Sequence, residues 1–237
     1  MPLVSAPSML PVPTRGKSSM VGQDQTWGAQ HDHLIELLHQ NDTVPVADLR
    51  TACNRRACGD RLQGHRMARI IILGNTAGGK STLARTLSRN RGLPYFEIDR
   101  LYWQSDWSVA PMDIYERQHA EIIKQDAWFI DGGGDLPSIH TRIERATEII
   151  LVDLPLWVHF WFAAERQITW ASGTIEHPPA GNRDMPPTGK LFEIIWTIDR
   201  EWMPLLRALC DEQEAKGKIV TRLKSIDDLN AHAQAEQ

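Results

Sequence analysis

The run from Gly74 to Ser81 has residue types and spacing suited to holding phosphate: it reads Gly-Asn-Thr-Ala-Gly-Gly-Lys-Ser. It fits the pattern G-x-x-x-x-G-K-[ST], directly after an apolar run and before an amphipathic one. Gly74 and Gly79 permit a tight turn, and backbone N–H groups of residues 77–82 can point at phosphate oxygens. Lys80 then reaches the β- and γ-phosphates, and the Ser81 hydroxyl is the expected magnesium ligand. The run predicts bound ATP and Mg²⁺. The expected nucleotide-binding residues are Gly74, Asn75, Thr76, Ala77, Gly78, Gly79, Lys80, Ser81 and Thr82.

Aspartates end three of the apolar runs: Asp99, Asp131 and Asp153. Carboxyl ends of parallel strands share one edge of a sheet, so these side chains are expected near the phosphate loop. Asp131 precedes three glycines and is predicted to hold the waters of the magnesium ion, which makes Ser81 and Asp131 the predicted metal residues. Asp99 is predicted to accept a proton from an acceptor hydroxyl or to orient the acceptor. Asp153 is the weakest candidate, because the neighbouring Pro155 is typical of a helix start.

A cation should neutralise the charge that develops on the transferred phosphoryl group, and Arg166 is predicted to supply it; the alternative is that Arg166 belongs to a solvated helix face. The predicted catalytic residues are Lys80, Asp99, Asp131 and Arg166. Residues 172–190 are rich in Gly, Pro, Asn and Thr, which is typical of a mobile lid between two apolar helices. Arg183 in that segment is a second candidate cation. Two acceptor classes stay open, because a phosphate acceptor needs no base whereas a hydroxyl acceptor benefits from one.

The elements that must position these residues alternate between strand and helix from Met67 onward. Short apolar runs predict five strands, at 69–73, 94–98, 128–130, 148–152 and 218–223. Amphipathic segments predict helices at 80–91, 112–125 and 155–170. Repeated strand–helix–strand units imply right-handed crossovers, so the sequence predicts an α/β fold with a mainly parallel sheet and helices on both faces.

The chain resembles a known family, the small adenylate kinase-like P-loop proteins called DNA topology modulation proteins. The resemblance runs from Met67 to His232 and rests on the phosphate loop, on Ile98-Asp99-Arg100-Leu101-Tyr102-Trp103, on Trp128-Phe129-Ile130-Asp131-Gly132 and on Ile149-Ile150-Leu151-Val152-Asp153-Leu154-Pro155. It implies a three-layer nucleotide kinase-like fold, a five-stranded sheet of order 2-3-1-4-5, an acceptor-binding segment after Asp99 and a lid near 166–190. The family usually carries several arginines where this chain has 167–174. Gly133-Gly134 looks more like the acceptor loop of shikimate kinases.

The residues before Met67 differ in composition from the rest. Residues 1–27 are rich in Pro, Ser, Gly and Gln and are expected to form a flexible tail. Residues 28–66 are predicted to be a short helical extension, and 67–237 the kinase-like domain; Met67 could also be the natural start. Two interpretations of the extension stay open. The arginines could contact DNA phosphates, or the cysteines and a histidine could bind a metal: Arg50, Arg55, Arg56 and Arg61, or Cys53, Cys58 and His65.

The composition of the chain argues against some classes of protein. No apolar stretch of membrane-spanning length and no secretory signal occurs, and the three cysteines fit a reducing compartment, so a cytoplasmic protein without a membrane partner is expected. The net charge of −4 gives no global attraction to nucleic acid. The oligomeric state is not predicted.

Aromatic residues and histidines give further expectations. Trp103 and Trp107 could cover the acceptor or simply pack. The helical stripe of Trp157, Trp161, Ala164 and Ile168 is predicted to be core. No catalytic role is assigned to the histidines, which lack metal-like spacing: His119, His140 and His159.

The leading functional hypothesis is an ATP- and Mg²⁺-dependent phosphotransferase acting on a small-molecule acceptor. The alternative is a nucleotide-binding regulator that senses ATP and contacts DNA or a protein partner through residues 28–66.

Overall fold

The structure of this 237-residue chain is a computed structural model that describes residues 67–175, 177–182 and 184–235. The predicted tail, the predicted helical extension with its DNA- or metal-binding candidates, and the candidate cation Arg183 all lie outside the described residues.

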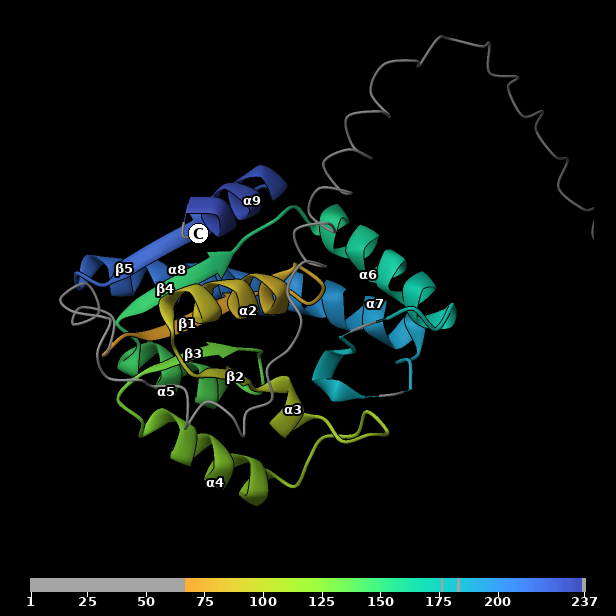
Figure 1. The fold of residues 1–237 in the computed structure, drawn as a ribbon, viewed down its shortest axis with the longest axis horizontal. Coiled ribbons are helices and arrows are strands. Elements are labelled where there is room, and N and C mark those ends of the chain that lie inside the picture. The colour runs from red at the N-terminus through yellow and green to blue at the C-terminus, as the bar shows by residue number, and fades with distance from the viewer. Residues whose placement is uncertain (1–66, 176, 183, 236–237) are drawn as a thin grey trace, which may run out of the picture. The chain divides into compact units, whose positions relative to one another are not determined.

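A five-stranded parallel sheet forms the centre of the fold (Figure 1). Its strand order is β2-β3-β1-β4-β5, which confirms the predicted order 2-3-1-4-5 and the α/β class. The strands are β1 (Arg69–Gly74), β2 (Tyr95–Glu97), β3 (Trp128–Asp131), β4 (Glu148–Val152) and β5 (Ile219–Leu223). Ile72 pairs with Asp131, and Gly74 pairs with Val152. The register therefore brings the start of the phosphate loop level with the ends of both neighbouring strands.

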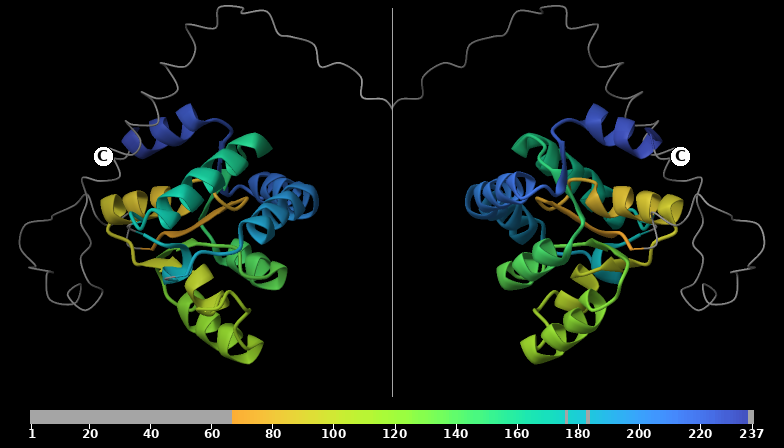
Figure 2. Two further views of the ribbon diagram at one scale, coloured as in Figure 1. Left: turned by 90° about the vertical axis from the view of Figure 1, so that its right-hand side faces the viewer. Right: turned by 90° about the vertical axis from the view of Figure 1, so that its left-hand side faces the viewer.

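Helices cover both faces of the sheet in a three-layer arrangement (Figure 2). Side chains alternate along β1, so Ile70 and Ile72 face one helical layer whereas Ile71 and Leu73 face the other. The first layer contains α2 (Lys80–Arg91), the start of α6 (Leu156–Ala171) and α9 (Ile226–Ala235). The second contains α4 (Met112–Ile123), α5 (Leu136–Arg145) and α8 (Met203–Ala215). Ile70, Ile71 and Ile72 are fully buried, so the apolar strand sequence is explained by helices on both sides.

Shorter elements connect these layers near the carboxyl ends of the strands. They are α3 (Asp99–Tyr102), the 3₁₀ turn η2 (Pro179–Gly181), α7 (Thr188–Thr197) and the π-helical segment η3 (Ile198–Trp202). Helix α7 packs against α6, with Phe160 and Phe192 in edge-to-face contact at 5.3 Å between ring centroids. The segment that was predicted to be a lid lies between these two helices in the chain.

The prediction that one apolar stripe of α6 is core is wrong. Trp157, Trp161 and Ile168 are 54%, 59% and 70% exposed. The buried face of the helix instead carries His159, Ala163, Gln167 and Trp170. Helix α6 is apolar on most of its circumference, so spacing alone could not tell which side would face the protein.

Candidate functional site

The phosphate loop connects β1 to α2, and its backbone is shaped by close contacts. A Cβ atom at Gly74, where φ is 142°, would lie 2.3 Å from the carbonyl oxygen of Val152, so β4 leaves no room for a side chain. Ala77 has a φ of 57° and Gly79 a φ of 76°, and both are therefore in the left-handed region. Left-handed residues that alternate with right-handed ones turn successive N–H groups toward one concave side, which is the backbone geometry that binds anions.

Lys80 and Ser81 begin α2 and meet the end of β3. Lys80 Nζ donates to the carbonyl oxygen of Asn75 at 2.7 Å. Burial lowers the pKa of Lys80, while the carboxylates of Asp131 and Asp99 oppose that change. The Ser81 hydroxyl hydrogen-bonds the Asp131 carboxyl group, which is 1% exposed. A hydroxyl and a carboxylate are hard oxygen donors of the kind that magnesium accepts together with waters. This donor pair therefore fits Mg²⁺.

Asp99 follows β2 and faces the glycines after β3. Its Oδ1 accepts a hydrogen bond from Gly133 N at 3.2 Å. Burial is the main cause that raises the pKa of Asp99 to about 6, and the nearby carboxylates of Asp131 and Glu97 add to it, while Lys80 opposes it. Burial also raises the pKa of Asp131. The two carboxyl groups therefore lie close enough to each other and to Lys80 to influence each other's protonation.

Arg166 on α6 completes the charged cluster. Burial lowers its pKa to about 10, and its strongest opposing partner is Asp99. Its positive charge also lowers the pKa of Lys80. Among the described residues its Nε is buried and has no hydrogen-bond partner. A partly buried guanidinium whose Nε is buried without a partner is costly unless an anion binds to it. The structure thus brings Lys80, Asp131, Asp99 and Arg166 within electrostatic reach of one another.

Asp153, the third aspartate at a strand end, is not part of this cluster. Its carboxylate accepts bonds from Arg207 Nε at 3.0 Å and Nη2 at 2.7 Å. It therefore joins β4 to α8.

A buried arginine that the sequence analysis did not single out holds the glycine loop 132–134. Arg142 on α5 is fully buried, and its guanidinium donates to the carbonyl oxygens of Gly132, at 2.8 Å, and of Gly133. A Cβ atom at Gly134, where φ is 64°, would lie 2.1 Å from the Tyr115 hydroxyl. A Cβ atom at Gly133 would lie 3.7 Å from the Trp202 ring. A Cβ atom at Gly132, where φ is 100°, would lie 2.9 Å from Asp99 Oδ1, so a side chain at that position would collide with Asp99. No signal in the sequence indicated the role of Arg142, because an arginine in an amphipathic helix is usually exposed.

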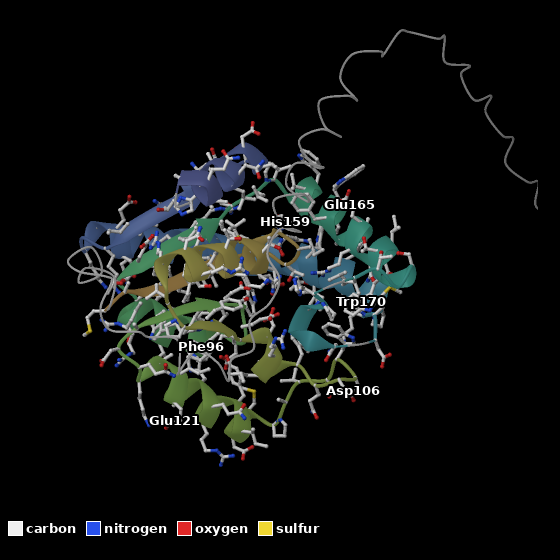
Figure 3. All side chains as sticks on the ribbon, in the orientation of Figure 1. Phe96, Asp106, Glu121, His159, Glu165 and Trp170 are labelled. Carbon is white, nitrogen blue, oxygen red and sulfur yellow. The ribbon has the colours of Figure 1, made fainter. Side chains whose placement is uncertain are left out.

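The predicted lid touches the segment that follows Asp99. Trp107 Nε1 donates to the carbonyl oxygen of Asp184 at 2.8 Å, and the Trp107 ring lies 6.1 Å from the Trp170 ring. Asn182 Nδ2 donates to the carbonyl oxygen of Gln104 at 2.9 Å. In Figure 3, Trp170 lies at the lid end of α6, and Asp106 lies on the loop that reaches toward it. Trp107 therefore packs between the two segments.

His159, to which no role was assigned, is buried beside the phosphate loop. It comes from α6, as Figure 3 shows, and its Nδ1 lies 2.9 Å from the carbonyl oxygen of Thr76. Asn75 donates from Nδ2 to the carbonyl oxygen of Ile195 on α7 at 2.9 Å. These contacts join residues 83 and 120 positions apart, so no local pattern could have predicted them.

The described residues contain neither a cluster of metal-ligating side chains nor a membrane-spanning helix. No group of three or more His, Cys, Asp or Glu side chains there could by itself hold a metal ion. None of the described helices has the length and apolar character needed to cross a membrane.

The fold and the loop define a P-loop kinase-like α/β protein. No family model and no curated protein matches the sequence, so membership of the DNA topology modulation family stays a prediction.

Several solved structures match the chain at low sequence identity. A gluconokinase from Sinorhizobium meliloti is 13% identical, with a TM-score of 0.44 over 72% of this chain and 91% of that one. A shikimate kinase from Acinetobacter baumannii, in complex with shikimate, is 15% identical, with a TM-score of 0.43 over 73% and 93%. A shikimate kinase from Aquifex aeolicus is 15% identical, with a TM-score of 0.38 over 71% and 95%. At these values the likeness does not indicate what this chain binds.

Proposed function

We propose that the chain is an ATP- and Mg²⁺-dependent phosphotransferase that transfers the γ-phosphoryl group of ATP to a hydroxyl group of a small molecule. The observation that carries the proposal is the cluster at the carboxyl edge of the sheet. There a phosphate-type loop, a buried lysine, a serine–aspartate pair, a second aspartate and an unsatisfied arginine meet.

Each residue has a task that follows from its surroundings. The loop N–H groups and Lys80 hold the β- and γ-phosphates, and Ser81 with Asp131 holds the magnesium ion and its waters. When bound, the ion neutralises phosphate charge. Arg166 stabilises the charge on the phosphoryl group, which its buried and unpaired Nε supports.

Asp99 is proposed as the base. It takes the proton of the acceptor hydroxyl, whose oxygen forms a bond to the γ-phosphorus as the bond to the β,γ-bridging oxygen breaks and ADP leaves. A pKa of about 6 leaves Asp99 ionised at neutral pH yet basic enough to accept that proton. The carboxylates of Asp131 and Glu97 add to the rise in the pKa of Asp99, and Glu97 is itself paired with Arg100 at 2.9 Å. A hydroxyl acceptor benefits from such a base whereas a phosphate acceptor does not need one, which supports a hydroxyl acceptor.

The test is a screen. The purified chain is incubated with Mg²⁺, ATP and a pool of hydroxylated metabolites and nucleotides, and mass spectrometry follows ATP-dependent gain of one phosphate. The Lys80→Ala and Ser81→Ala variants should abolish the gain, and the exposed Lys124→Ala variant should keep it. A chain that binds ATP but phosphorylates nothing in the pool would argue against a kinase. Phosphorylation of nucleoside monophosphates alone would overturn the proposal that the acceptor group is a hydroxyl.

A further inference from the structure

His159 contacts the carbonyl oxygen of the peptide group between Thr76 and Ala77. Burial is the main cause that lowers the pKa of His159, and the charge of Lys80 lowers it further, while the backbone hydrogen bonds to Thr76 and Leu154 oppose that change. A carbonyl oxygen can only accept a hydrogen bond. The nitrogen that lies 2.9 Å from Thr76 O, Nδ1, therefore carries the proton and donates it.

This bond determines where the next N–H group points. The described peptide bonds are trans, and in a trans peptide the C=O and N–H bonds point in opposite directions. With the Thr76 carbonyl fixed toward His159, the Ala77 N–H must point to the other side of the loop. The left-handed φ of 57° at Ala77 is part of the same backbone turn. The loop's concave, anion-binding side is therefore the side away from His159.

The same ring explains a glycine that the phosphate-loop pattern does not require. Gly78 occupies one of the four freely variable positions between Gly74 and Gly79. A Cβ atom at Gly78 would lie 2.7 Å from His159 Cε1 and 3.2 Å from Nδ1. Gly78 itself does not have a positive φ, so its backbone would accept alanine. The ring is the nearest obstacle to a side chain there, and the carbonyl oxygen of Asn75, at 3.3 Å from the Cβ position, is a smaller one.

The histidine also connects the loop to the proposed phosphoryl-binding cation. His159 and Arg166 are seven residues apart on α6, which is about two turns, so they lie on nearly the same face of the helix, roughly 10 Å apart along its axis. On the neighbouring helix α7, Ile195 accepts the bond from Asn75. Both helices that flank the predicted lid are thus fastened to the loop.

We infer that His159 is a positioning residue for the phosphate loop: its Nδ1–H holds the Thr76 carbonyl outward so that the Ala77 N–H faces the nucleotide phosphates, and Gly78 is glycine to admit its ring. The inference rests on the proposed function for its nucleotide. It predicts that residues 78 and 159 are coupled.

The test is a double-mutant cycle read by the dissociation constant for MgATP, measured by calorimetry. His159→Ala should weaken binding about tenfold, because one bond to a buried carbonyl is lost. Gly78→Ala should weaken it at least as much, since the ring must move. The double variant should bind like His159→Ala alone, because the added methyl group occupies the vacated space. His140→Ala, at an exposed histidine of α5, should bind within twofold of wild type.

A conservative variant separates positioning from packing. The Nδ2 of asparagine and the Nδ1 of histidine are both two bonds away from Cβ, so His159→Asn can still donate to the Thr76 carbonyl oxygen. This variant should bind MgATP within about threefold of wild type. Thermal unfolding should show both variants destabilised by the loss of ring packing, whereas only His159→Ala loses affinity. Equal affinity losses in both would reduce His159 to a packing residue and overturn the inference.

Two further results would overturn the inference while leaving the proposed function intact. They are wild-type affinity in His159→Ala, and a double variant whose loss is the product of the two single losses. A wild-type chain that shows no binding of MgATP refutes the proposed function, and the nucleotide-positioning role with it. The steric coupling of residues 78 and 159 would still be visible in that case as non-additive unfolding temperatures.

Discussion

Replacing the proposed base by its neutral isostere should stabilise the protein while it abolishes activity. Burial and the carboxylates of Asp131 and Glu97 raise the pKa of Asp99 from 3.8 to about 6, a value that already includes the opposing effect of Lys80. The folded protein therefore binds a proton at Asp99 more tightly than the unfolded chain does. Ionising this group costs stability, and the cost is absent below pH 3.8 and complete above pH 6.

The magnitude follows from the two pKa values. Each pKa unit corresponds to about 1.4 kcal/mol, so a rise from 3.8 to about 6 means that ionised Asp99 destabilises the fold by roughly 3 kcal/mol. Asp99→Asn removes this charge, and its side-chain oxygen can still accept the bond from Gly133 N. The free energy of unfolding at pH 8 should rise by that amount.

Urea unfolding at several pH values is the assay. At pH 8 the midpoint of Asp99→Asn should exceed that of wild type by about 1 to 2 M, given an ordinary dependence on urea. The difference should shrink as the pH falls toward 5, because wild-type Asp99 then takes up a proton. Asp126→Asn, at an exposed aspartate, should unfold like wild type throughout. A less stable or unchanged Asp99→Asn protein at pH 8 would refute the assignment of a strained, buried carboxylate.

Three other predictions concern the site and the corrected helix face. Activity on a hydroxyl acceptor should fall about tenfold per pH unit below pH 6, because Asp99 must be ionised to act as a base; a flat rate profile from pH 5 to 8 would contradict this. Arg166→Ala should reduce kcat by about 10³-fold and change the MgATP dissociation constant less than about threefold, whereas an unchanged kcat would place the cation elsewhere. Trp161→Ser, at a side chain that is 59% exposed, should change the free energy of unfolding by less than about 0.5 kcal/mol. Trp128→Ala, at a fully buried side chain, should lower it by about 3 to 5 kcal/mol. Equal losses in the two variants would contradict the exposed face of α6.

The features that local patterns encode were predictable from the sequence. Buried strands need continuous apolar runs, and β4 spans the predicted residues Glu148–Val152. Helix α2 also has its predicted bounds, with Gly92 at its end in the left-handed conformation at a φ of 64°. The phosphate loop was recognisable because its glycines and its lysine are adjacent in the chain. The parallel order of the sheet places Asp99 and Asp131 beside it.

The sequence by itself thus determined the five strands, the phosphate loop and the helix that follows it, all of which are built from neighbours in the chain. It did not predict the ranges of α5, α8 and α9, and Asp99 begins α3 instead of ending β2. Only the tertiary structure decided which stripe of α6 is exposed, that Asp153 binds Arg207, and that His159 supports a peptide 83 residues before it. Hydrogen bonds and steric exclusion act over a few ångströms in space, and residues far apart in the chain reach such distances only after the helices have packed on the sheet. No neighbour in the chain explains why residue 78 is glycine. The explanation is the imidazole ring of His159, which packs against this position in the folded protein.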